Sequence, residues 1–248
     1  MSSRKQDVKI AAGGWKNLYR MGAAAPLLTL LFYISEFTLI SWYSFPSSME
    51  EWFQLCQQSK ILGLLYLNSL DILSITLLGL MFLALFMALR KSDQAWMLAA
   101  TFFALLGVVV FVVPRTAALS ILTLSDRHAL ASSGEEQARL LAAGEALGSM
   151  SLPTPQTAGF FFMAVGVLIL SVVMLRTQSF SRITAWLGIL ASVATFADDI
   201  SLVVYPAVST TLMILSGLFW IPWWLMISRE LFRLNKTVTQ EEETYYAG

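Results

Sequence analysis

The chain is poor in the residues on which most catalytic and metal sites depend. It has one cysteine, Cys56, and one histidine, His128, among 248 residues. A single cysteine excludes an intramolecular disulfide, and a single histidine excludes metal sites and haem ligation built on paired imidazoles. The sequence also has no Gly-x-Ser-x-Gly turn or serine–histidine pairing for nucleophilic catalysis. We therefore expect no cofactor, no metal site and no catalytic residue, in a protein that is not an enzyme.

Charge is scarce as well, and it is balanced. Asp, Glu, Lys and Arg make up 13% of the residues, against about 25% in ordinary soluble domains. The 16 basic residues equal the 16 acidic ones in number, so the composition excludes a nucleic-acid partner. Hydrophobic residues reach 57% and lie in long blocks, which points to the lipid bilayer as the surroundings of this chain.

Six of these blocks are long enough to cross a bilayer, which requires about 20 mostly apolar residues. They cover residues 23–45, 61–89, 95–119, 157–175, 183–204 and 208–227. The first is too long for the core of a signal peptide, so we expect a retained span. The second is longer than a span requires, and we expect its outer part, residues 61–70, to tilt, kink or extend past the bilayer.

The basic residues divide unequally between the two sides of this arrangement, and the side richer in them faces the cytoplasm. One side carries 12 of the 16: Arg4, Lys5, Lys9, Lys16, Arg20, Arg90, Lys91, Arg176, Arg182, Arg229, Arg233 and Lys236. The other side has Lys60, Arg127 and Arg139. We therefore expect a multi-pass protein of the inner (plasma) membrane with both termini in the cytoplasm. Residues 1–22 would form a basic tail, 23–231 the transmembrane domain and 232–248 a disordered tail.

Two loops on the non-cytoplasmic side have helical patterns. In residues 46–59, Trp52, Phe53 and Leu55 form the apolar side of a short interfacial helix. In residues 133–150, Ser133 and Glu136 have the spacing of a capping box, followed by a mildly amphipathic helix. We favour a surface connector that packs on the bundle over a binding lid. The predicted fold is thus an all-α bundle of six transmembrane helices with short interfacial helices in the outer loops.

Four stretches carry a resemblance to a known family. They are LSDRHALASSGEEQARLLAAGEAL at 124–147, SRITAWLGILASV at 181–193, LLGLMFLALFMALRK at 77–91 and WLMISRELFRL at 224–234. The chain resembles, over residues 15–234, the bacterial and archaeal membrane proteins of domain-of-unknown-function family 4386. The resemblance implies six helices and a bacterial or archaeal origin. It implies no activity, cofactor or catalytic residue.

Five ionisable residues interrupt the apolar spans: Glu36, Asp71, Arg115, Asp198 and Asp199. Each costs a few kcal/mol in lipid, so such groups usually face a bundle interior or a water-filled cavity. With a rise of about 1.5 Å per residue, all five lie roughly 20 to 30 Å from the cytoplasmic ends of their helices, in the outer half of the bilayer. Asp198 and Asp199 point about 100° apart on a helix, so we expect one to face the bundle and the other the outer water.

The cluster supports three hypotheses. In the first, Glu36, Asp71, Arg115 and one of the two aspartates line a hydrated pocket for a cation, a proton or an amine-bearing lipid ligand, in transport or sensing. In the second, Arg115 joins carboxylates as a clasp between helices of a structural or assembly subunit with other membrane partners. The third, an intramembrane enzyme, lacks a nucleophile–base pair. Near the last span's Pro222, Trp220, Trp223 and Trp224 suggest an aromatic belt at the membrane surface.

Overall fold

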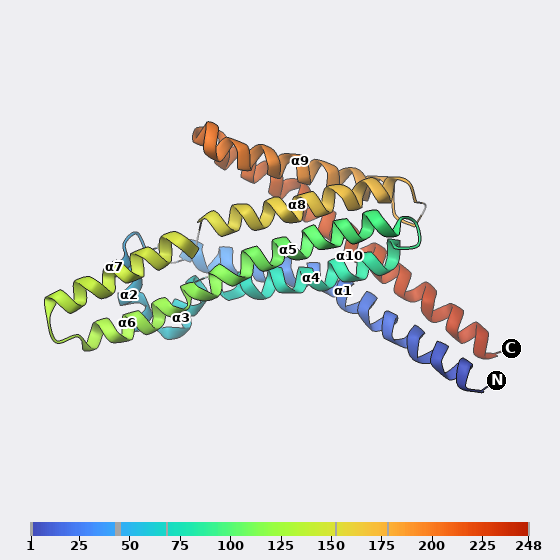
Figure 1. The fold of residues 1–248 in the computed structure, drawn as a ribbon, viewed down its shortest axis with the longest axis horizontal. Helices are drawn as coiled ribbons and strands as arrows, with labels where there is room; N and C mark the ends of the chain where they lie inside the picture. The colour runs from blue at the N-terminus through green and yellow to red at the C-terminus, as the bar shows by residue number, and fades with distance from the viewer. Residues whose placement is uncertain (1, 43–45, 68, 152, 178, 248) are drawn as a thin grey trace.

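The computed structural model describes residues 2–42, 46–67, 69–151, 153–177 and 179–247, and every regular element in these ranges is helical. Figure 1 shows the arrangement of these helices. They are α1 (Ser2–Trp42), α2 (Met49–Gln58), α3 (Lys60–Tyr66), α4 (Ser69–Leu89), α5 (Gln94–Ala118), α6 (Ser120–Leu130), α7 (Gly134–Ser151), α8 (Pro153–Leu175), α9 (Arg182–Val204), the 3-10 turn η1 (Pro206–Val208) and α10 (Ser209–Ala247).

Six stretches of helix among the described residues are long and apolar enough to cross a membrane. They are Trp15–Thr38, Ser69–Leu89, Gln94–Leu130, Thr157–Leu175, Arg182–Leu202 and Pro206–Thr237. This result confirms the prediction of an all-α, multi-pass membrane protein. The two termini lie at one end of the bundle, together with the α4–α5 and α8–α9 connections (Figure 1).

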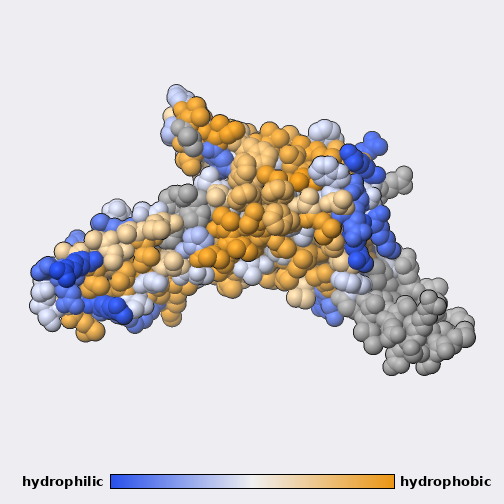
Figure 2. Space-filling model, viewed as in Figure 1, coloured by the Kyte–Doolittle hydropathy of each residue, from blue (hydrophilic) through white to orange (hydrophobic). Residues whose placement is uncertain are grey.

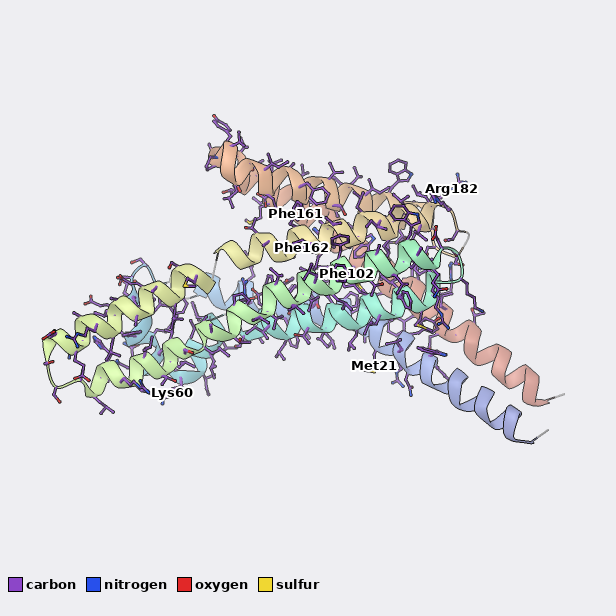
Figure 3. All side chains as sticks on the ribbon, in the orientation of Figure 1. Met21, Lys60, Phe102, Phe161, Phe162 and Arg182 are labelled. Carbon is purple, nitrogen blue, oxygen red and sulfur yellow. The ribbon has the colours of Figure 1, made fainter. Side chains whose placement is uncertain are left out.

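The surface of the molecule is divided into two polar ends and an apolar middle. In Figure 2, an apolar belt separates a hydrophilic band near the α8–α9 connection from the hydrophilic tip of the α6–α7 hairpin. Figure 3 labels Arg182 at the end that holds the termini and Lys60 toward the opposite end. The two basic residues therefore lie on opposite sides of the apolar belt, as their positions between the spans predict.

The second span begins later than the long apolar run that contains it. Helix α3 ends at Tyr66, and α4 begins at Ser69. The hydroxyl of Ser69 donates to the carbonyl of Leu64 at 2.5 Å, so a side chain satisfies one of the carbonyl groups left at the end of α3. Residues 61–66 thus belong to a separate helix, whereas Ser69 and Leu70, which we expected to depart from the span with them, are the first residues of α4.

The two ends of the chain extend their neighbouring spans. Helix α1 starts at Ser2, so the expected basic tail is helical and continuous with the first span. Helix α10 continues to Ala247, which differs from the disorder that we expected after residue 231. Extension of an existing helix adds one hydrogen bond for each residue fixed, which makes continuation easier than nucleation.

Small residues bring the spans into close contact. A Cβ atom on Gly107 of α5 would lie 2.5 Å from the carbonyl oxygen of Gly159, and one on Gly159 of α8 would lie 2.7 Å from Cβ of Phe111. Neither glycine could therefore carry a side chain at this contact. Packing of backbone against backbone is the usual way in which helices associate in lipid, where burial of apolar surface adds little.

Besides the hydrophobic core of the bundle itself, a smaller one lies at the end of the molecule opposite the termini. It is built from α2, α3 and α6, with α7 packed against it (Figure 1). Its buried residues are Trp52, Phe53, Cys56, Tyr66, Leu67 and Ile121. The two predicted loop helices are thus present, and the apolar side of α2 contacts neighbouring helices. The predicted cap is confirmed too, because the Glu136 amide donates to Ser133 Oγ at 3.2 Å.

Candidate functional site: an acidic and aromatic cavity between the spans

The arginine in the third span is buried and paired. Arg115 is 2% exposed, and its Nη2 lies 3.3 Å from Oδ2 of Asp71 on α4. Its guanidinium also lies over the ring of Phe111, with Cζ 3.9 Å from the ring centroid. Phe111 precedes Arg115 by four residues, so the two side chains share one face of α5. The guanidinium is therefore held between its own helix and α4.

Glu36 of the first span joins this pair. Its carboxyl group lies close to that of Asp71, and the charge of Arg115 acts on both carboxyl groups. Three of the five residues predicted to form the cluster, Glu36, Asp71 and Arg115, are thereby brought together from α1, α4 and α5. This arrangement has the geometry of the predicted clasp.

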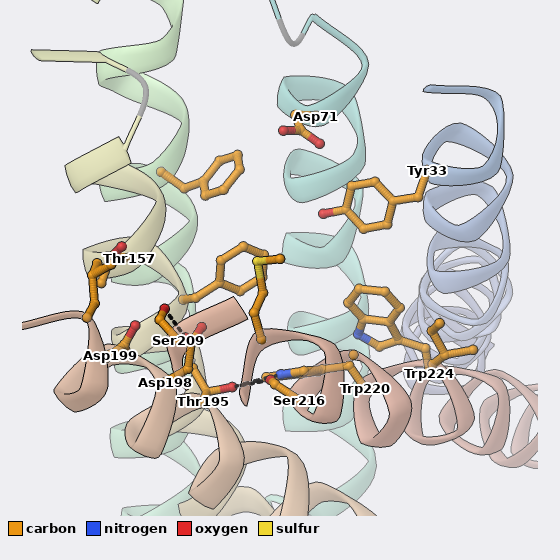
Figure 4. Close-up of a pocket in the computed structure, with 16 residues that line it drawn as sticks. Tyr33, Asp71, Thr157, Thr195, Asp198, Asp199, Ser209, Ser216, Trp220 and Trp224 are labelled. Carbon is orange, nitrogen blue, oxygen red and sulfur yellow. Dashed lines mark hydrogen bonds between the residues drawn. The ribbon is translucent and has the colours of Figure 1, made fainter. Parts of the chain in front are cut away.

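The other two predicted residues line a cavity with a volume of about 460 Å³. Asp198 and Asp199 lie on its wall near the outer end of α9. Asp71, on α4, lines another part of the wall, near Tyr33 (Figure 4). Asp71 is therefore common to the clasp and the cavity. The lining residues come from α1, α4, α5, α8, α9 and α10.

Both adjacent aspartates face this cavity, whereas we expected only one to turn inward. Oδ1 of Asp198 accepts a hydrogen bond from the Ser209 hydroxyl at 2.7 Å. Oδ2 of Asp199 is buried and has no hydrogen-bond partner among the residues that the structure describes. The expectation assumed close packing around α9. Because the helices separate at this end, the cavity covers more than one face of α9, and a 100° difference does not part the two carboxyl groups.

A hydrogen-bond network joins α9 to α10 in the cavity wall. Oγ1 of Thr195 lies 2.9 Å from Oγ of Ser216, and it accepts a hydrogen bond from Nε1 of Trp220 at 3.0 Å. All three side chains are buried. Since a buried polar group is costly without a partner, this network fixes the register of the two helices where they meet.

The tryptophans of the last span are in the core, so the prediction of an aromatic belt is wrong. Trp220, Trp223 and Trp224 are 7%, 0% and 4% exposed. The reason lies on the neighbouring helix: a Cβ on Gly188 of α9 would be 2.7 Å from Nε1 of Trp223. A glycine at that position leaves room for an indole inside the bundle.

Several lining residues were missed by the sequence reasoning, although a signal for them exists. Met213, Ser216, Trp220 and Trp224 all line the cavity. They follow one another at intervals of three and four residues, which places them on one face of α10. The spacing predicts a shared face, but it does not tell whether that face meets lipid or protein.

The described part of the chain contains no group of three or more His, Cys, Asp or Glu side chains placed to hold a metal ion. The fold and the cavity together define an integral membrane protein of six spans with an acidic, aromatic hollow between its helices. Residues 21–228 match the family described as Domain of unknown function (DUF4386), and the chain belongs to that family. No curated protein and no solved structure matches the chain.

Proposed function

We propose that this protein binds a small organic cation, a protonated amine, in the cavity beneath the α9–α10 hairpin. The observation that carries the proposal is the meeting of adjacent carboxyl groups, Asp198 and Asp199, with the rings of Trp220 and Trp224 around one hollow. The role is binding for transport or sensing, without chemical change of the ligand. The surroundings are a cell's plasma membrane, with the cavity in the half away from the cytoplasm.

The charges around the cavity favour a cation. The lining side chains include three carboxyl groups and, among the described residues, no lysine, arginine or histidine. Arg115 lies behind this surface and already pairs with Asp71. Asp71 is therefore offset locally, whereas no described basic side chain lines the cavity beside Asp198 and Asp199. A cleft of one sign with apolar walls concentrates ligands of the opposite sign.

The walls favour an organic ligand over a bare metal ion. Five aromatic rings line the hollow, those of Tyr33, Phe111, Phe160, Trp220 and Trp224. Aromatic faces attract ammonium groups through their quadrupoles, and tryptophan does so most strongly. The volume of about 460 Å³ lies within the range of about 300–1,000 Å³ that is usual for small-molecule sites. A metal ion would instead need converging oxygen ligands.

A second candidate function is that of an assembly subunit in a larger membrane complex. The group formed by Glu36, Asp71 and Arg115 favours it, because this group joins three helices without needing a ligand. The two candidates differ in what Asp198 does. In a binding protein, replacing Asp198 weakens the binding of an amine. In an assembly subunit, the wild-type protein binds no amine, so the replacement has no effect on binding.

The direct test is binding of alkylammonium ions to the purified full chain in lipid nanodiscs, with the corresponding alcohols as uncharged probes. We expect saturable stabilisation by the ammonium ions alone. Asp198→Asn and Asp199→Asn should each weaken binding about tenfold or more, the usual effect of losing a charged hydrogen bond. Glu145→Gln makes the same chemical change on the exposed surface of α7 and should leave binding unchanged. Equal effects of amines and alcohols would contradict the proposal.

The proposed orientation has its own test. In a Cys56→Ala background, Ser92→Cys lies between α4 and α5, and Ser132→Cys lies between α6 and α7. A maleimide that cannot cross membranes should label the second cysteine in intact cells and the first only after lysis. The reverse pattern would place the termini, and with them the basic connections, outside the cytoplasm.

A further inference from the structure

We infer that the ligand carries a neutral oxygen acceptor in addition to its ammonium group, so that the site takes an amino ether, an amino alcohol or an amino carbonyl compound. This inference rests on the proposed function and specifies its ligand. It comes from the opposite end of the cavity, where a buried hydrogen-bond donor, Nε1 of Trp224, lacks a partner among the described residues.

The first observation concerns two indoles on one face of α10. Nε1 of Trp220 donates to Thr195 Oγ1 at 3.0 Å. Nε1 of Trp224, one turn farther along, is buried and has no hydrogen-bond partner in the described part of the protein. Trp224 is 4% exposed, and it lines the cavity. An indole N–H can only donate, so this group requires an acceptor that the described residues do not provide there.

A tyrosine stands beside this unpartnered donor. The rings of Tyr33 and Trp224 lie 5.9 Å apart at an interplanar angle of 31°. Figure 4 shows the Tyr33 hydroxyl pointing into the cavity, with the Trp224 indole on the same side. Two N–H or O–H groups from α1 and α10 thus face the space that a ligand would fill.

The two ends of the cavity are complementary in kind. Asp198 and Asp199 lie on the side of Figure 4 opposite Tyr33 and Trp224. At the first end, a buried oxygen of Asp199 lacks a donor; at the second, a buried nitrogen of Trp224 lacks an acceptor. One ligand satisfies both ends if an ammonium group and an oxygen are separated along its chain.

The oxygen is neutral because of Asp71. This carboxyl group lines the cavity near the Tyr33 end, as Figure 4 shows, whereas its partner Arg115 is not in the lining. An anionic group on the ligand would meet Asp71 before it met the guanidinium. A neutral ether, hydroxyl or carbonyl oxygen accepts the Trp224 N–H without that repulsion.

The test compares ω-methoxyalkylammonium ions with n-alkylammonium ions of equal length, over a series of lengths, on the full chain in nanodiscs. The wild-type protein should bind the methoxy compound about fivefold more tightly at the length that spans the cavity, the usual gain from one hydrogen bond. Trp224→Phe should abolish this preference, while the weaker attraction of an ammonium group to the smaller ring should lower the affinity for both series alike. Tyr33→Phe should reduce the same preference, and it keeps the test possible if Trp224→Phe does not fold.

Trp223→Phe is the matched control. Nε1 of Trp223 is also buried without a described partner, but Trp223 is not among the residues that line the cavity. The preference should survive this substitution. Equal affinities for both ammonium series in the wild type, or a preference that persists in Trp224→Phe, would overturn the inference while leaving amine binding intact. Failure of both series to bind would overturn the proposed function and this inference with it.

Discussion

Arg115 of α5 and Asp71 of α4 form an ion pair of 3.3 Å in which the guanidinium is 2% exposed and the carboxylate 13%. The pair lies in the spans, so salt in the surrounding water screens it little. Glu36 of α1 lies close to the same carboxyl group. One carboxylate thus connects three helices and also lines the cavity, which couples the stability of the bundle to the shape of the site.

Removal of the arginine should destabilise the protein strongly. Arg115→Met leaves Asp71 and Glu36 without their buried cation, and we expect a loss of about 3–5 kcal/mol in the free energy of unfolding in detergent micelles. The double variant Arg115→Met/Asp71→Leu should recover much of this loss. Arg139→Met, which breaks the exposed pair with Glu135, is the control and should change nothing measurable. Equal losses in the single and double variants would contradict this account of the pair.

Thr195→Val tests the network that joins α9 to α10. The substitution keeps the shape of the side chain but takes the acceptor from Trp220 Nε1 and the partner from Ser216 Oγ. We expect the free energy of unfolding to fall by about 1–3 kcal/mol, the cost of an unsatisfied buried group. Thr76→Val is the matched control, because the exposed Thr76 hydroxyl only donates to Ile72 in its own helix. A loss of equal size in both variants would show that the network adds nothing.

Two glycines should respond in opposite ways to alanine. In Gly188→Ala, the new Cβ would lie 2.1 Å from Oγ of Ser171 and 2.7 Å from Nε1 of Trp223, so these buried side chains or α9 must shift, and the melting temperature should fall. In Gly217→Ala, nothing lies within 4 Å of the new atom. Alanine in the interior of a helix is favoured over glycine by about 1 kcal/mol, so this variant should melt at a higher temperature. Similar shifts in both variants would contradict the close contact at Gly188.

The lone cysteine should be unreactive in the folded protein. Burial, with a smaller contribution from Asp126, raises the pKa of the Cys56 thiol to about 11. A pKa raised by two units from 9.0 lowers the thiolate fraction at neutral pH roughly a hundredfold, and the thiolate is the reactive form. Iodoacetamide should therefore label Cys56 far faster after unfolding.

The same shift sets the sign of a pH effect. Between pH about 9 and about 11, the Cys56 thiol keeps its proton in the folded protein but ionises in the unfolded chain. The free energy of unfolding therefore falls as the pH rises through this range. Cys56→Ala should remove that part of the pH dependence. Equal labelling rates for folded and unfolded protein would exclude burial of the thiol.

The six spans could be predicted because lipid imposes a simple demand: about 20 apolar residues in a row, with every backbone group bonded inside the helix. The cap at Ser133 could be predicted for a similarly local reason. The choice of partners could not, because it depends on where helices approach one another. The sequence places Glu36, Asp71 and Arg115 in the outer half of the bilayer, and the structure adds that Asp71 lies beside both of the others.

The predictions for the tryptophans and for the two aspartates were wrong because each depends on contacts between helices. A lipid-facing aromatic belt and a buried aromatic wall have the same composition, and only Gly188 across from Trp223 distinguishes them. Likewise, helical geometry gives the angle between Asp198 and Asp199 but not the width of the hollow that both face. Contacts between helices distant in the sequence determine both outcomes.

The core of α2, α3, α6 and α7 has a consequence for handling this protein. We expect this core, near the hydrophilic tip of the α6–α7 hairpin, to be surrounded by water, whereas the bundle relies on close backbone contacts such as that of Gly107 with Gly159. Urea weakens the first kind of association by solvating apolar groups. Exchange of lipid for a harsh detergent acts on the second. We therefore expect the core of α2, α3, α6 and α7 to unfold before the bundle in urea, and the bundle to unfold first in a harsh detergent.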